Sequence, residues 1–189
     1  MSIVNGIQGK PLLNPVNELI ENLDTWVIFL LTVVAAPIFE ELLYRKLLID
    51  RVAHYGDRVA IVLSGVLFGL SHGNFYQFFY AFGLGVVFAY VYINTGKLRY
   101  TVIFHAVINF MGSIVALHAA DNIWFAMAYG IFMIAAVVLG VVFLILYRRE
   151  IHLKPAMLAI PRGRRFETLF LNLGMILFFF VSVGLFLFS

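Results

Sequence analysis

The chain has no cysteine and few charged residues, and each of these facts excludes certain classes of protein. Without cysteine it has no disulfide, no thiolate metal site and no cysteine nucleophile, and nothing indicates its redox compartment. Charged residues make up 12% of the sequence and apolar residues 63%, whereas soluble domains have about a quarter charged. Such a chain cannot cover a water-facing surface. The composition also excludes disorder, collagen and coiled coil, so we expect a chain dissolved in lipid.

The sequence consists largely of long apolar runs, and its mean hydropathy is +0.99. A helix needs about 20 residues to cross the hydrocarbon core of a bilayer. No run alternates with period two, and lipid admits only helices or closed barrels. The sequence therefore predicts an all-α, polytopic transmembrane helical bundle with about six spanning helices. Their approximate ranges are 26–45, 59–72, 75–93, 100–117, 123–147 and 166–188, of which 59–72 is short for a full span.

We divide the chain into an interfacial N-terminal lead-in, 1–24, and a single helical membrane domain, 25–189. Within that domain the motif-bearing core covers about 26–117, and accessory helices cover about 123–188.

The basic residues indicate the topology of these spans. If 46–58 is cytoplasmic and the chain alternates sides, every Lys and Arg except Lys10 falls on the cytoplasmic side or at its rim. This positive-inside pattern predicts a multi-pass protein of the cell membrane with both termini outside the cytoplasm. The net charge of +3 is then explained by topology and contacts with lipid headgroups, so the bilayer is an expected partner and nucleic acid is not.

Few ionisable residues remain inside the predicted spans, and each costs about 2.5–3.5 kcal/mol on insertion scales. Glu41 and Arg45 lie four residues apart on one helix face and can pair. Glu40 lies about 100° around the helix and gains no partner from that pair, so it suits a general base. The alternative is a structural network of all three residues. Pro37 cannot donate to the Val33 carbonyl and should kink this helix.

Two further segments contribute histidines. Gly65, Gly69 and Gly73 recur every four residues and permit close helix packing. Ser64, Phe68 and His72 form the adjacent stripe, so His72 is expected at a tight helix contact.

A third segment carries the polar stripe Thr101, His105, Asn109 and Ser113. His105 and Asn109 can direct two donors at one point, as a developing oxyanion requires. The simpler alternative is interhelical hydrogen bonding.

Two other kinds of catalytic site fit the sequence less well. The pattern Gly69-Leu70-Ser71-His72-Gly73 fits G-x-S-x-G, with His105 as a possible base, but a nucleophile elbow needs a strand before the serine. Glu40, Glu41, His72 and His105 offer metal ligands, yet no H-E-x-x-H or E-x-x-H spacing occurs. We therefore predict no metal and no cofactor.

Three motifs resemble those of the CAAX-processing and bacteriocin-processing (CPBP) intramembrane proteases, which include the type II CAAX prenyl endopeptidases. They are Glu40-Glu41-x-x-x-Arg45, Phe68-x-x-x-His72 and His105-x-x-x-Asn109, within about 26–117. The resemblance implies a glutamate-dependent mechanism without a metal. Glu40, helped by His72, would activate a water; His105 and Asn109 would form the oxyanion hole; Glu41 and Arg45 would support the site.

The expected function is thus an intramembrane endopeptidase that cleaves a membrane-associated peptide or protein of the CAAX or bacteriocin type. The alternatives are a non-catalytic membrane scaffold or immunity protein of the same fold and a metal-dependent membrane protease. The oligomeric state is not predicted. For Glu40 to reach the depth of His72, Arg45 must be submerged with Glu41, so we expect the first helix to continue past Arg45.

Overall fold

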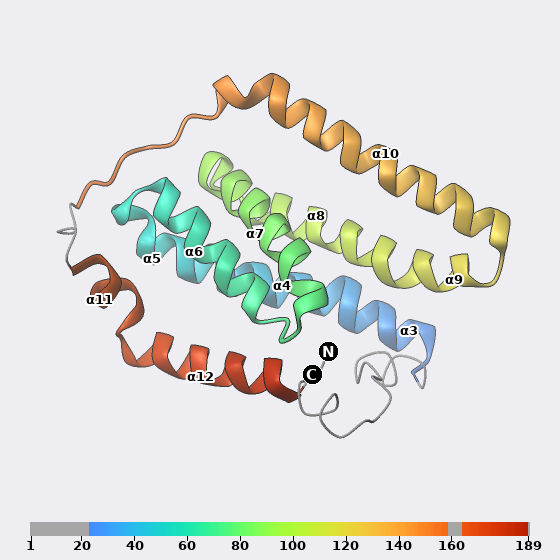
Figure 1. The fold of residues 1–189 in the computed structure, drawn as a ribbon, viewed down its shortest axis with the longest axis horizontal. Coiled ribbons are helices and arrows are strands. Elements are labelled where there is room, and N and C mark those ends of the chain that lie inside the picture. Colours follow the sequence, from blue (N-terminus) through green and yellow to red (C-terminus); the bar gives the residue numbers. More distant parts are fainter. Residues whose placement is uncertain (1–22, 159–163, 189) are drawn as a thin grey trace.

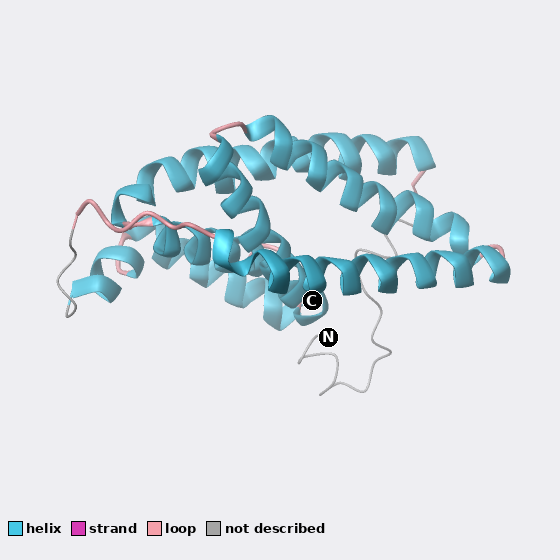
Figure 2. Ribbon diagram, turned by 90° about the horizontal axis from the view of Figure 1, so that it is seen from above, coloured by secondary structure: helices cyan, strands magenta, loops and turns pink. Residues whose placement is uncertain are grey.

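The structure is a computed structural model that describes residues 23–158 and 164–188. Most of the lead-in predicted for 1–24 lies outside the described residues. Within the described ranges there is no strand, and Figure 2 shows only helices joined by loops. The all-α prediction is therefore confirmed.

Among the described residues, four helices are long and apolar enough to cross a membrane: Thr25–Tyr55, Phe75–Thr95, Leu98–Ala119 and Ile123–Glu150. The predicted count of about six is not confirmed. Helix α6 (Asp57–Leu70) has 14 residues, fewer than the roughly 20 that a full span needs. The range predicted as 166–188 is two helices, α11 (Arg165–Phe170) and α12 (Leu173–Phe188). They separate because the Asn172 side chain accepts from the Met175 N–H at 3.0 Å, which starts a new helix.

The first long helix does continue past Arg45, as predicted. It comprises α3 (Thr25–Ile28), η1 (Phe29–Ala35), α4 (Ala36–Glu41), η2 (Leu42–Leu47), α5 (Leu48–Val52) and η3 (Ala53–Tyr55). Segments η1 and η2 are π-helical. They flank the short α4 segment that carries both glutamates, and π-helical turns in α-helices often occur at functional sites.

Helices α6 and α7 (Phe75–Thr95) pack closely because glycines meet at their contact. A Cβ on Gly85 would lie 2.9 Å from Gly65 Cα, and one on Gly69 would lie 3.0 Å from the Phe78 carbonyl oxygen. The predicted role of Gly65 and Gly69 is thus confirmed. Gly73 differs, because it lies after α6 with a φ of +68° and faces Leu185 of α12. Gly73 therefore belongs to a turn, where glycine adopts a positive φ readily, and not to the helix face predicted for it.

The third long helix runs through α8 (Leu98–Phe110), η4 (Met111–Val115) and α9 (Ala116–Ala120), and it lies beside the first in Figure 1. Helix α10 (Ile123–Tyr147) has no buried residue and lies at the edge of the bundle. It contacts η4 where the Tyr129 hydroxyl donates to the Met111 carbonyl at 2.8 Å. A protein helix with so apolar a surface suits direct contact with lipid.

After α10 and η5 (Arg148–Glu150), an extended stretch binds the turn between α5 and α6. The buried Asp57 carboxylate accepts from the Lys154 N–H at 2.7 Å, and the Met157 N–H donates to the His54 carbonyl at 3.0 Å. The α5–α6 turn, the α7–α8 turn and the end of α10 lie at one end of the molecule in Figure 1. These are the connections that carry the basic residues, which agrees with the positive-inside pattern.

The buried core lies between α5, α6 and α7, next to the helix that carries the glutamates. One cluster of buried residues comprises Ile49, Ala60, Ile61, Ala89 and Tyr92. A second joins Leu63 and Leu67 of α6 to Met175 of α12. The core therefore fixes α6 against the first helix, where the polar residues meet.

Candidate active site

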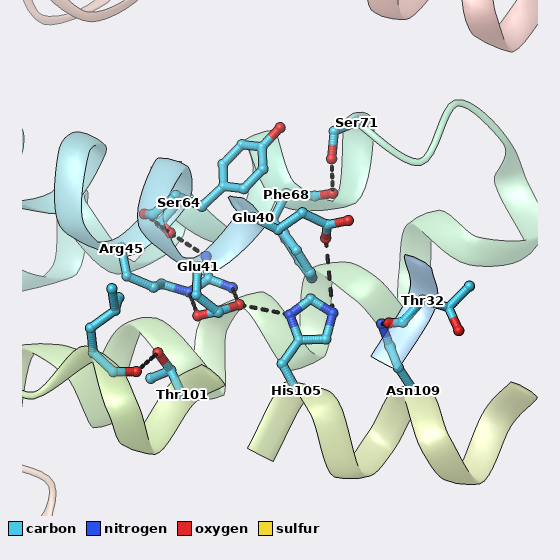
Figure 3. Close-up of polar contacts among 12 residues, drawn as sticks. Thr32, Glu40, Glu41, Arg45, Ser64, Phe68, Ser71, Thr101, His105 and Asn109 are labelled. Atoms are coloured by element: carbon cyan, nitrogen blue, oxygen red, sulfur yellow. Dashed lines mark hydrogen bonds and ion pairs between the residues drawn. The ribbon is translucent and has the colours of Figure 1, made fainter. Parts of the chain in front are cut away.

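Glu41 is the centre of a buried polar network (Figure 3). Its side chain is fully buried, as is that of Arg45. Arg45 Nε lies 2.9 Å from Glu41 Oε2, and Arg45 Nη2 donates to Oε1 at 3.2 Å. The predicted pairing of these two residues is present, and η2 holds Arg45 in place one turn after Glu41. A buried carboxylate needs such compensation, because desolvation of an unpaired charge is costly.

His105 of α8 joins the same carboxylate. Its Nδ1 lies 3.0 Å from Glu41 Oε1. The residue is buried, with 3% of its surface exposed. A carboxylate can only accept, so Nδ1 carries the proton and donates. This fixes the orientation of the ring and turns Nε2 toward Glu40, whose Oε2 is 3.9 Å away. A carboxylate that orients a histidine in this way is a common arrangement around catalytic imidazoles.

Glu40 and Glu41 each have a buried Oε2 that accepts no hydrogen bond from the described residues, but only Glu41 Oε2 is in an ion pair with Arg45, whose Nε is 2.9 Å away. Oε2 of Glu40 is buried, and within the described part of the chain no residue donates to it. The 3.9 Å to His105 Nε2 is too long for a direct hydrogen bond. This oxygen therefore retains its full capacity to accept a proton, and it faces an imidazole.

His72 lies in the turn directly after α6. Its Nδ1 is 2.8 Å from the Phe68 carbonyl oxygen. Because that oxygen can only accept, Nδ1 is the donor and Nε2 of the neutral ring is left with a lone pair. Phe68 packs edge-on against His72 at 5.0 Å and against His105 at 5.5 Å, and so contacts both rings.

Asn109, one turn after His105, also faces the first helix. Its Nδ2 donates to the Thr32 carbonyl at 2.8 Å. Ser113, the next member of the stripe, lies 3.3 Å from the Thr32 hydroxyl, and Thr101 donates within its own helix to Leu98. The stripe thus makes interhelical hydrogen bonds, as its simpler interpretation predicts, and also brings His105 to the glutamates.

Ser64 and Phe68 also belong to this site, although no role was predicted for either residue. Arg45 Nη1 donates to Ser64 Oγ at 2.7 Å, and Ser64 donates to the Tyr44 carbonyl at 2.9 Å. The Arg45 guanidinium lies over the Phe68 ring at 4.7 Å, which adds a cation–π contact. Their spacing in the sequence could have indicated that they belong to the site, since Ser64 and Phe68 share the helix face of His72.

Ser71 does not occupy a nucleophile elbow. Its hydroxyl donates to the Phe68 carbonyl at 2.7 Å, at the end of a helix rather than after a strand. His105, its possible base, is directed at the two glutamates instead. Among the described residues, no three His, Cys, Asp or Glu side chains are placed to hold a metal ion. The donors of Arg45 and His105 already occupy the Glu41 oxygens.

Comparison with known proteins agrees with the motifs. A family model described as type II CAAX prenyl endopeptidase Rce1-like matches residues 22–111, just under half of the chain. No curated protein matches the chain, and no solved structure matches it. The matched range contains Glu40, His72, His105 and Asn109. The resemblance drawn from the three motifs is confirmed, because residues 22–111 match the model of the Rce1-like family of type II CAAX prenyl endopeptidases.

Proposed function

We propose that this chain is a glutamate-dependent intramembrane endopeptidase. The observation that carries the proposal is the pair of adjacent glutamates with different environments. Glu41 is neutralised by Arg45 and orients His105, whereas Glu40 has a free buried oxygen 3.9 Å from the same imidazole. Two carboxylates in one site with different surroundings are typical of a division between positioning and proton transfer.

In the proposed reaction Glu40, assisted by His72, removes a proton from a water. The water oxygen forms a bond to the carbon of the scissile peptide bond, and the carbonyl oxygen becomes an oxyanion. His105, when protonated on both nitrogens, donates from Nε2 to that oxyanion, together with an N–H of Asn109. The C–N bond then breaks, and the leaving nitrogen takes the proton back from Glu40.

The family match supports a proposal for the substrate class. We propose a membrane-associated peptide or protein, with a prenylated CAAX segment as the first candidate and a bacteriocin-like peptide as the second. An apolar modification would hold such a peptide in the bilayer, beside a site enclosed by apolar helices. We further place the chain in the cell membrane with both termini outside the cytoplasm. Because the chain has no cysteine, single cysteines at 97 and 154 can test the side: a membrane-impermeant maleimide that labels them in intact cells would contradict this topology.

The decisive experiment is Glu40→Gln in the 189-residue chain reconstituted in liposomes. The probe is a quenched-fluorescent farnesylated peptide ending in a CAAX sequence, with a non-prenylated bacteriocin leader peptide as second substrate. Glu40→Gln should reduce kcat by about 10²-fold or more, as loss of a general base does. Glu167→Gln, an exposed carboxylate, is the matched control and should cleave like the unaltered chain.

The alternatives give different outcomes. Full activity of Glu40→Gln would remove the mechanism. Loss of cleavage in a chelator favours the metal-dependent protease, and labelling of Ser71 by a fluorophosphonate favours a serine protease. A scaffold or immunity protein would cleave neither peptide, and its phenotype would survive Glu40→Gln.

A further inference from the structure

We propose that Pro37 is a positioning residue for Asn109. By leaving the Thr32 carbonyl without a main-chain donor, it provides the acceptor that holds the Asn109 amide. This inference rests on the proposed function, in which Asn109 donates to the oxyanion. It concerns a proline outside the three motifs, and its expected effect is on the rate of the chemical step.

The main-chain register around Pro37 carries the argument. In an α-helix the Thr32 carbonyl would accept from the N–H of Ala36. Here Ala36 closes the π-helical segment, and its N–H donates five residues back, to the Leu31 carbonyl. The next residue in the same register is Pro37, which has no N–H to offer Thr32. Neither register therefore supplies the Thr32 carbonyl with a donor from the following turn.

That carbonyl is where the Asn109 side chain binds. Nδ2 of Asn109 donates to it at 2.8 Å, across 77 residues of sequence and between two membrane helices. A main-chain carbonyl without a donor is costly in a membrane helix, so the pairing satisfies both groups. Pro37 itself is fully buried within the first helix, where a proline is otherwise unfavourable.

The bond also decides which way the amide faces. Because the carbonyl oxygen can only accept, the NH₂ group of Asn109 must lie toward Thr32. One N–H is then used, and among the described residues the second N–H has no partner. An amide held in this orientation is preorganised to donate, which is what makes an oxyanion donor effective. Asn109 follows His105 by one turn of α8, so both donors approach from the same helix face.

The test is Pro37→Ala, assayed with the same farnesylated peptide in liposomes. The new N–H stands opposite the Thr32 carbonyl and competes with Asn109 for it. We expect kcat to fall about tenfold with KM unchanged, a smaller loss than the 10²–10³-fold expected when an oxyanion donor is removed. In an Asn109→Ala background the same change should have no further effect on kcat. Pro155→Ala, a proline of the 151–158 stretch, is the matched control and should leave kcat unchanged.

Several outcomes overturn the inference. Pro37→Ala with unchanged kcat contradicts it, as does an equal loss of kcat in the Asn109→Ala background. If Pro37→Ala does not fold, the unaltered chain still gives an answer. In ¹⁵N-asparagine-labelled protein, one proton of the Asn109 side-chain amide should be protected from exchange, and rapid exchange of both would contradict the proposal. Cleavage by Glu40→Gln would instead remove the proposed function, whatever Pro37→Ala does.

Discussion

Glu41 Oε1 lies 3.0 Å from His105 Nδ1, so one buried carboxylate joins the first membrane helix to α8 and sets the direction of the imidazole. The same group is the counter-ion of Arg45. Glu41 therefore joins the two helices and orients His105, whereas the buried Oε2 of the neighbouring Glu40 has neither a hydrogen bond nor an arginine partner within 23–158 and 164–188.

Glu40→Gln and Glu41→Gln should separate stability from activity. Glu41→Gln removes the charge that compensates buried Arg45, and breaking a buried pair costs about 3–5 kcal/mol. We expect its Tm in detergent to fall clearly and cleavage to be lost. Glu40→Gln should lose cleavage yet melt like the unaltered chain. Equal Tm values for both variants, measured by a fluorescence melt, would contradict the assignment of Glu41 as the structural member.

Ser64→Ala should destabilise the chain through Arg45. The change leaves Nη1 of Arg45, which now donates to Ser64 Oγ at 2.7 Å, as a buried donor without a partner. The cost is about 1–3 kcal/mol. Ser182→Ala, a buried serine of α12, provides the control for loss of a hydroxyl away from Arg45 and should melt within a degree or two of the unaltered chain. Similar melting of the two variants would mean that the Ser64 contact contributes little.

Gly85→Ala should disturb the α6–α7 contact. Its Cβ would lie 2.9 Å from Gly65 Cα and 3.1 Å from Phe68 Cδ1, and both main chains are fixed by their helices. Overpacking of this kind costs about 1–3 kcal/mol. Displacement of Phe68 should also lower cleavage, because that ring contacts both histidines. Gly83→Ala on the same helix meets nothing within 4 Å and should be neutral or slightly stabilising. A neutral Gly85→Ala would show that the helices separate easily.

Asp57→Ala should release the stretch 151–158 from the α5–α6 turn. The Asp57 carboxylate holds the Lys154 N–H at 2.7 Å, so its loss should speed hydrogen exchange at Lys154. The amides of Met157 and Leu158, which donate to His54, should follow because the same stretch holds them. Asp121→Ala, in an exposed position, serves as the comparison. Unchanged exchange at Lys154 would show that the stretch is held by other contacts.

The composition was sufficient for the fold class, because apolar runs of this length have few alternatives to membrane helices. It was insufficient for the number of spans. The break at Asn172 within a continuous apolar run depends on one side chain capping α12, and hydropathy does not detect a cap. The continuation of the first helix past Arg45 could be deduced, since Glu40 and His72 had to lie at one depth.

The spacing of residues predicted most of the side chains that lie together at the candidate site, but it did not predict their hydrogen-bond partners. Spacing of four residues places Glu41 with Arg45 on one helix, because the helix repeat is a local property. The bonds of Glu41 to His105, of Arg45 to Ser64 and of Asn109 to Thr32 join residues 64, 19 and 77 positions apart. Such contacts are decided by how the helices pack: glycines bring α6 onto α7, and a proline frees a carbonyl that only a neighbouring helix can reach.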